Sequence, residues 1–149
     1  MRIFVTATTL LVLVLLAAPA VAQDRPNFSG NWQFDASKSE LHNLKLANAT
    51  WTIKQDDSSI DIAENEGGSG RAIELKCTTD GKDCKVSGEK AKASMWYNGP
   101  MLVEMETRGD HVVRYRLTMS QDGKTMKVET TQIVPQTDGI DVLVFEKHS

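Results

Sequence analysis

The sequence predicts an all-β protein, an antiparallel up-and-down β-barrel of about eight to ten strands with a short helical segment after the first strand. Three observations predict this fold. Apolar and polar residues alternate through most of the chain after residue 22, which is the period of a half-buried strand. Turn sequences containing glycine recur at intervals of roughly eight to twelve residues. Only the segment 36–47 has room for a helix, of about one or two turns.

The expected strands follow one another along the chain with short connections. The first strand spans 27–34, where Phe28, Gly30 and Trp32 alternate on one face. Asp-Gly or Asn-Gly pairs at 80–81, 98–99 and 122–123 mark turns between later strands. The remaining strands are expected at 50–54, 59–64, 71–77, 83–87, 90–97, 101–107, 111–119, 124–133 and 140–147.

The hairpin 101–119 carries a prediction about register. Matching its two apolar faces requires a three-residue loop at 108–110, with Thr107 opposite His111. That register places Glu104 opposite Arg114 on the other face. Two interpretations of the charged face stay open, a solvent-exposed ladder or a ligand-orienting cavity wall. The apolar face consists of Met101, Val103, Met105, Val113, Tyr115 and Leu117.

Length and composition are those of one ordinary globular domain. The chain has 149 residues, of which 40% are hydrophobic and 25% charged, with a formal charge of -3. This composition excludes disordered, collagen-like and disulfide-dense proteins. The acidic balance argues against nucleic acid as a partner.

The first 22 residues have the pattern of a signal peptide. Arg2 precedes a mostly apolar run at 3–16, and small residues follow at 17–22. We expect cleavage before Gln23, with cleavage after Ala20 or an uncleaved membrane anchor as the alternatives. The sequence thus divides into a signal peptide at 1–22 and a β-barrel domain at 23–149, with no membrane span in the mature chain. Export places the expected monomer in a periplasm or outside the cell.

The two cysteines are expected to form a structural disulfide. Export implies an oxidising compartment, and both cysteines lie in the mature part of the chain. Cys77 and Cys84 flank the turn at 80–81, so they fall on facing arms of one hairpin. A redox-active pair is disfavoured, because the spacing is not Cys-x-x-Cys.

Two motifs resemble the calycin group of lipocalins and fatty-acid-binding proteins. Phe-Ser-Gly-Asn-Trp at 28–32 resembles their Phe-x-Gly-x-Trp opening, and Val-Phe-Glu-Lys at 144–147 resembles their last strand. The likeness implies a barrel in which Gly30 permits close strand approach and Trp32 plugs one end. The pattern looks most like that of uncharacterised exported bacterial lipocalin-like proteins. Avidin-like and protease-inhibitor barrels begin in a similar way.

The sequence also departs from this resemblance. Fatty-acid-binding proteins hold a ligand carboxylate with an Arg-x-Tyr pair just before the final Glu-Lys, where this chain has Leu143 and Phe145. Neither side chain has a hydrogen-bond donor, so a carboxylate held in that way is not expected. The connection after the first strand is also shorter than the family's helical lid, which predicts an open or differently capped mouth.

Motifs for catalysis or metal binding are not found. His42, His111 and His148 are scattered, and nucleophile-elbow, phosphate-loop and dinucleotide fingerprints are missing. The acidic residues around 56–66 lack the spacing of a calcium loop. The sequence therefore predicts neither an enzyme nor a bound cofactor or metal.

Two functions fit the predicted barrel. The first is an exported carrier of a small apolar or amphipathic molecule in the barrel interior. The second is a protein-interaction or protease-inhibitor-like module with a packed interior and exposed apolar residues near 23–28 or 67–71. The carrier hypothesis is preferred, and the candidate ligand-binding residues are Met95, Tyr97, Met105, Arg114, Tyr115 and Arg116.

Overall fold

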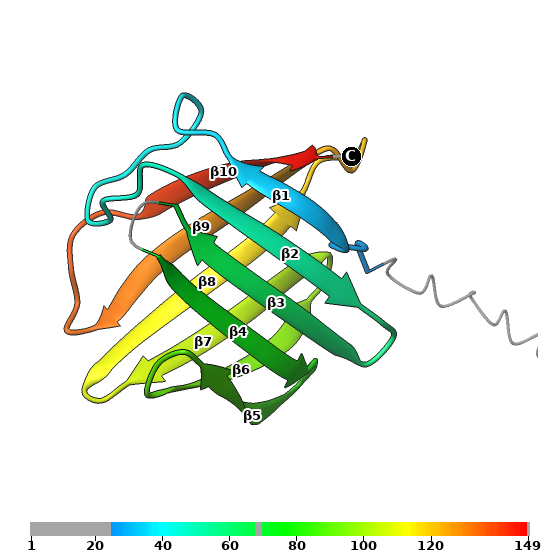
Figure 1. The fold of residues 1–149 in the computed structure, drawn as a ribbon. Helices are drawn as coiled ribbons and strands as arrows, with labels where there is room; N and C mark the ends of the chain where they lie inside the picture. The colour runs from blue at the N-terminus through cyan, green and yellow to red at the C-terminus, as the bar shows by residue number, and fades with distance from the viewer. Residues whose placement is uncertain (1–24, 68–69, 149) are drawn as a thin grey trace, which may run out of the picture.

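The protein is a closed barrel of ten antiparallel strands (Figure 1). The computed structural model describes residues 25–67 and 70–148, so the expected signal peptide lies outside the described residues. Each strand pairs with its neighbours along the chain, and β1 closes the barrel against β10. The strands are β1 (Gly30–Phe34), β2 (Ala49–Gln55), β3 (Ser59–Glu66), β4 (Arg71–Thr78), β5 (Asp80–Ser87), β6 (Ala91–Asn98), β7 (Met101–Arg108), β8 (His111–Met119), β9 (Thr125–Val134) and β10 (Asp141–His148). The described residues contain no helix long and apolar enough to span a membrane.

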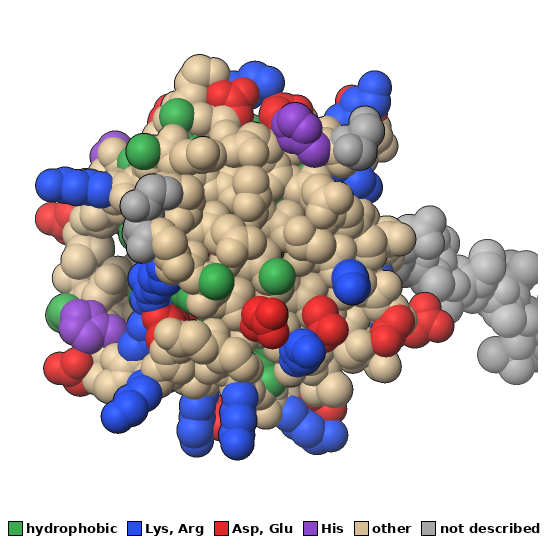
Figure 2. Space-filling view, in the orientation of Figure 1, with side chains coloured by type: hydrophobic (Ala, Val, Ile, Leu, Met, Phe, Trp, Pro, Cys, Tyr) green, Lys and Arg blue, Asp and Glu red, His purple; other side chains and the backbone are tan. Residues whose placement is uncertain are grey.

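Side chains along each strand point alternately into the barrel and toward its surface, which separates the core from the surface. Ile53, Ile62, Leu75 and Val86 are register partners on four successive strands, and each is at most 5% exposed. Their sequence neighbours point outward, where Figure 2 shows charged side chains spread over the barrel surface. The predicted fold class is confirmed, because a period of two in the sequence is what a barrel wall with one buried face requires.

Trp32 fills one end of the barrel. Its side chain is 1% exposed, and its Nε1 donates a 2.8 Å hydrogen bond to the carbonyl of the fully buried Phe28. The Lys147 ammonium lies 5.3 Å from the centre of the indole ring. A Cβ atom at Gly30, whose φ is 145°, would come within 2.5 Å of Lys147 Cε. The structural roles predicted for Gly30 and Trp32 therefore have a steric basis.

A disulfide joins the most weakly paired neighbouring strands. β4 and β5 share only two register pairs, Glu74 with Ser87 and Leu75 with Val86. Beyond them, Cys77 and Cys84 form the predicted disulfide, with a Cα–Cα distance of 5.2 Å. The covalent link therefore holds β4 against β5 where backbone hydrogen bonds do not.

We expect removal of this disulfide to lower the free energy of unfolding by about 2–3 kcal/mol, because the denatured chain regains the entropy of a short loop. The change is the double substitution Cys77→Ser and Cys84→Ser, measured by urea denaturation. Reduced wild-type protein is the control and should show the same loss. Equal stability of the oxidised wild type and the double variant would contradict this prediction.

The register predicted for the hairpin 101–119 is wrong. Arg108 pairs with His111 across a two-residue turn, so Glu104 lies opposite Tyr115 and Met105 lies opposite Arg114. This shift by one residue reverses the face of β7, because side chains alternate along a strand. Leu102, Glu104 and Glu106 are consequently buried at 0%, 2% and 3% exposure. The charged face of β7 points into the barrel.

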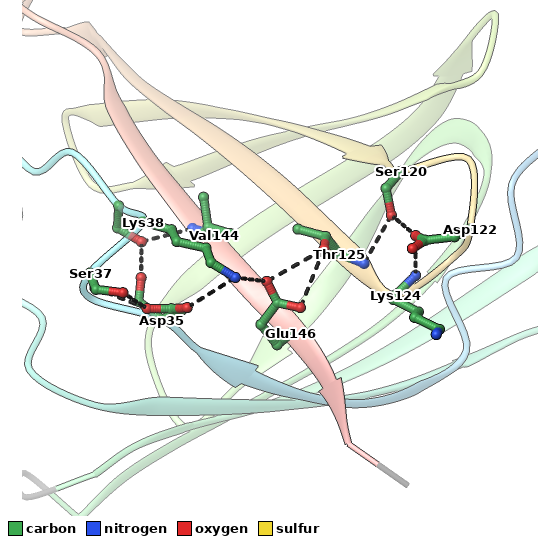
Figure 3. A network of polar contacts seen from close by, with 10 residues as sticks. Asp35, Ser37, Lys38, Ser120, Asp122, Lys124, Thr125, Val144 and Glu146 are labelled. Atoms are coloured by element: carbon green, nitrogen blue, oxygen red, sulfur yellow. Dashed lines mark hydrogen bonds and ion pairs between the residues drawn. The ribbon is translucent and has the colours of Figure 1, made fainter.

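No helix forms in the segment 35–48, although the sequence predicted a short one. The Asp35 carboxylate accepts hydrogen bonds from the backbone N–H and the hydroxyl of Ser37, which makes a turn. The chain then runs along β10, where Glu40 and Val142 exchange backbone hydrogen bonds of 2.8 and 2.7 Å. Lys38 Nζ also lies 2.8 Å from Glu146 Oε1 of β10 (Figure 3). Pairing with β10 uses backbone groups that a helix would need.

Candidate functional site

A cavity of about 130 Å³ lies in the barrel, beneath the loop that joins β1 to β2. Roughly 150 Å³ is enough to hold a benzene molecule in a protein interior. The segment 44–46, from the loop between β1 and β2, forms part of its wall. The apolar part of the wall also includes Ala49, Trp51, Ile73, Val128 and Leu143.

One side of the cavity is polar. Arg108 of β7, Tyr115 of β8 and Thr130 of β9 line it, and Glu64 of β3 lies apart from them, between its register partners Trp51 and Ile73. Glu66 and Arg71 also line the cavity. Tyr115 is the register partner of both Glu104 and Thr130, so β7, β8 and β9 place these three side chains in one layer of the barrel. Thr130 is 5% exposed, and its Oγ1 has no hydrogen-bond partner among the described residues. The cavity thus joins an apolar surface to a cluster of ionisable groups.

Burial and mutual repulsion shift these ionisable groups toward their neutral forms. Burial raises the pKa of Glu64 to about 8, and the nearby Glu106 carboxylate adds to the shift. Burial likewise raises the pKa of Glu104 well above its ordinary value, with Glu64 contributing. The pKa of Tyr115 is also raised by burial and by the neighbouring carboxylates. The interior therefore disfavours negative charge.

Two arginines partly offset this concentration of carboxyl groups. Arg108 Nε contacts the Glu106 carboxylate and lies 2.8 Å from Glu89 Oε1. Arg71 contacts Glu89 and lies 4.0 Å from Glu66 Oε1. Each guanidinium therefore contacts two carboxylates, whereas Glu64 and Glu104 form no ion pair within the described residues.

Asp141 holds the loop 35–48 over the cavity end. Its Oδ1 accepts backbone N–H bonds from His42, Asn43 and Leu44, at 2.5, 2.8 and 3.2 Å. Asp141 is 2% exposed, and although burial opposes the change, these three bonds lower its pKa. One carboxylate at the start of β10 therefore caps three successive amides of the loop that joins β1 to β2.

Replacing this carboxylate should loosen the mouth. We expect Asp141→Asn to lower the free energy of unfolding by about 2 kcal/mol, because hydrogen bonds to a charged acceptor are stronger than those to an amide. The pKa of Asp141 is lowered in the fold, so its stabilising contribution is lost as pH falls through the folded-state pKa. Hydrogen exchange should accelerate at residues 42–44, whereas the exposed control Asp138→Asn should leave it unchanged. Unchanged exchange in Asp141→Asn would contradict this role.

The six candidate ligand-binding residues are not brought together. Tyr115 lines the cavity, and Met95 is fully buried in the core. Tyr97 is half-buried, with the Arg25 guanidinium 4.8 Å above its ring. Met105, Arg114 and Arg116 lie on the outer face of β7 and β8, where Arg116 Nε is 3.6 Å from Glu129. These three side chains would line the cavity only if β7 and β8 both turned their opposite faces toward the barrel interior.

Sequence reasoning missed the residues that give the cavity its chemistry. The sequence shows Glu64 only as one of the acidic residues around 56–66 that lack calcium-loop spacing, and it predicts Arg108 in the loop 108–110. The signal that finds Arg108 is the pair Gly109-Asp110, because a two-residue turn is the commonest hairpin connection and makes Arg108 the partner of His111. Among the described residues, no three His, Cys, Asp or Glu side chains are arranged to hold a metal ion.

Leu143 and Phe145 occupy the positions where the family resemblance would place an anion-binding pair. Leu143 lines the cavity, while Phe145 is fully buried with its ring 5.8 Å from that of Phe34 and 4.8 Å from that of Trp51. Aromatic packing fills the space in which a donor would stand. The sequence prediction that β10 offers no carboxylate-binding pair is consistent with this packing.

Comparisons with known proteins identify the fold. No family model and no curated protein matches the sequence. Among solved structures, a point mutant of the fluorescent protein UnaG is similar over 82% of this chain and 96% of its own, with 16% identity and a TM-score of 0.63. Zebrafish ileal bile acid-binding protein complexed with cholic acid is similar over 81% and 98%, with 18% identity and a TM-score of 0.58. The chain therefore has the fold of a fatty-acid-binding-protein-like calycin barrel.

Proposed function

We propose that this protein is an exported, non-enzymatic binding protein that holds a small amphipathic molecule in the cavity lined by Trp51, Glu64, Tyr115 and Thr130. The observation that carries the proposal is the cavity itself, which joins an apolar wall to a buried hydroxyl without a partner among the described residues. Concave sites of this composition are typical of ligand pockets. The structurally similar bile acid-binding protein, seen with cholic acid, supports binding in a barrel of this kind.

The size of the cavity limits the ligand. Pockets for drug-sized molecules typically occupy about 300–1,000 Å³, whereas this one is near 130 Å³. The buried part of the ligand should therefore be about as large as one small ring. A larger molecule would have to displace the segment 44–46 at the mouth.

The alternative, an interaction module, is less well supported. It required exposed apolar residues near 23–28 or 67–71, but Phe28 is completely buried. The large exposed apolar side chains of the described residues lie elsewhere, at Leu44, Ile133, Val134 and Ile140.

Native mass spectrometry of protein purified from its own host tests the proposal. We expect a stoichiometric small molecule, released by organic extraction, and a protein mass that begins at Gln23. Bare protein whose NMR spectrum also fails to respond to benzyl alcohol, a neutral probe of the expected size, would contradict binding in the cavity. A mass that includes residues 1–22 would contradict export by signal cleavage.

A further inference from the structure

The cavity wall contains carboxyl groups that no cation of the described chain contacts. Arg108 contacts Glu106 and Glu89, and Arg71 contacts Glu89 and lies near Glu66. Glu64, which lines the cavity, has no hydrogen bond or ion pair with any described residue. Glu104, behind the wall and 2% exposed, is likewise unpaired within the described chain. Buried carboxyl groups of this kind are costly, so their presence calls for a positive or donating partner.

A second observation concerns the hydroxyl groups of the same wall. Thr130 is 5% exposed, lines the cavity, and has a hydroxyl without a hydrogen-bond partner in the described structure. Tyr115, its register partner, lines the cavity beside it. The carboxylate of Glu64 and the two hydroxyl oxygens can all accept hydrogen bonds. A primary ammonium group is a matching ligand, because it presents three donors and no acceptor.

Building on the proposed function, we propose that the cavity binds amines, with an ammonium group held between Glu64, Tyr115 and Thr130 and a small apolar group against Trp51, Val128 and Leu143. The charge of such a ligand is opposite to that of a fatty acid or another carboxylate ligand. An anion in the same position would lie against unpaired carboxyl groups. The guanidinium that lines the cavity beside the β7–β8 turn, that of Arg108, is already shared by Glu89 and Glu106.

The proposal makes binding dependent on pH. An ammonium beside Glu64 favours the carboxylate, so binding to the protonated free protein releases a proton, and affinity rises with pH. Below about pH 8 the rise approaches tenfold per pH unit. The charged and titratable groups that act on Glu64 are Glu66, Glu89, Glu104, Glu106, Arg108 and Tyr115. Lys45 and Arg71 also line the pocket.

Three probes that share one ring and differ in charge test the proposal: benzylamine, benzyl alcohol and benzoate. Their dissociation constants are measured by NMR titration of the oxidised mature protein. We expect benzylamine to bind at least about tenfold more tightly than benzyl alcohol, and benzoate not to bind. Glu64→Gln should weaken benzylamine by about tenfold or more and weaken benzyl alcohol by much less, because the amide keeps the shape of the wall and removes only the charge. Glu74→Gln, on the outer face of β4, is the matched control and should change neither.

Thr130→Val provides a second, nearly isosteric variant, which should weaken benzylamine more than benzyl alcohol. Benzyl alcohol or benzoate binding as tightly as benzylamine would overturn the amine proposal and leave the proposed binding function standing. Unaltered benzylamine affinity in Glu64→Gln would also overturn it. Failure of all three probes to bind would count against the cavity as a binding site, and therefore against both proposals.

Discussion

The free energy of unfolding should fall by about 3–4 kcal/mol between about pH 5 and pH 8 through the titration of Glu64 alone. The folded-state pKa of this carboxyl is raised to about 8. The unfolded chain therefore loses the proton at a lower pH than the folded protein does. Its stabilising effect is complete below the unfolded pKa and is lost as pH rises toward 8. Glu104 and Glu106, whose pKa values are also raised, should act in the same direction.

Urea denaturation at several pH values checks this prediction. Glu64→Gln should be more stable than the wild type at pH 8 and should have a flatter pH profile, because an amide cannot ionise. Glu74→Gln should retain the wild-type profile. Identical slopes for Glu64→Gln and the wild type would show that Glu64 is not the group responsible. The lowered pKa values of Asp56, about 2, and Asp141 affect stability only at more acidic pH.

Trp32→Ala should lower the free energy of unfolding by about 3–5 kcal/mol, the usual cost of removing a buried aromatic side chain. The indole is 1% exposed, and its hydrogen bond to the Phe28 carbonyl would also be lost. Because Trp32 itself does not line the cavity, ligand affinity should change less than stability in protein that remains folded.

Trp96→Ala is the control, since Trp96 lies on the outer face of β6 and is only partly buried. It should cost about 1 kcal/mol, the centre of the range for point substitutions, because the ring is only partly buried. Far-UV circular dichroism is the suitable probe of unfolding, because both variants lose a fluorophore. A cost for Trp32→Ala no larger than that for Trp96→Ala would contradict the role of Trp32 as the plug.

The stability cost of the buried glutamates bears on function. Replacement of Glu64 by an amide should stabilise the protein at pH 8. The native carboxyl therefore lowers the free energy of unfolding at that pH. Destabilising ionisable groups in cavities are often functional, because a ligand supplies the missing partner. Ligand binding would then return part of the stability that the empty cavity lacks.

The sequence predicted the barrel well because its strongest signals are local. Alternation and glycine turns define each strand, and the motif at 28–32 places Trp32 at the closed end. The disulfide between Cys77 and Cys84 also follows from a local turn. These features depend on a few neighbouring residues.

The site was harder to predict because it contradicts the hydrophobic pattern. On β7, Met101, Val103 and Met105 form the more apolar face, yet Glu104 and Glu106 point inward. The two-residue turn at Gly109-Asp110 and the inward Leu102, opposite Leu117, set that register. The prediction of a short helix between β1 and β2 failed for another reason. Its conformation depends on Asp141 and Val142, about one hundred residues away in sequence.

The most direct test of the central claim, that a small molecule occupies this cavity, is to fill the cavity from within. Ala49 is 2% exposed and lines the wall, so Ala49→Leu should occupy the ligand's space. Thr50→Leu adds similar bulk to the outer face of the same strand. In an NMR titration with benzyl alcohol, we expect binding and signal shifts at Trp51 and Thr130 in the wild type and in Thr50→Leu, and loss of both in Ala49→Leu. Equal affinity in all three proteins would place the ligand elsewhere and contradict the account.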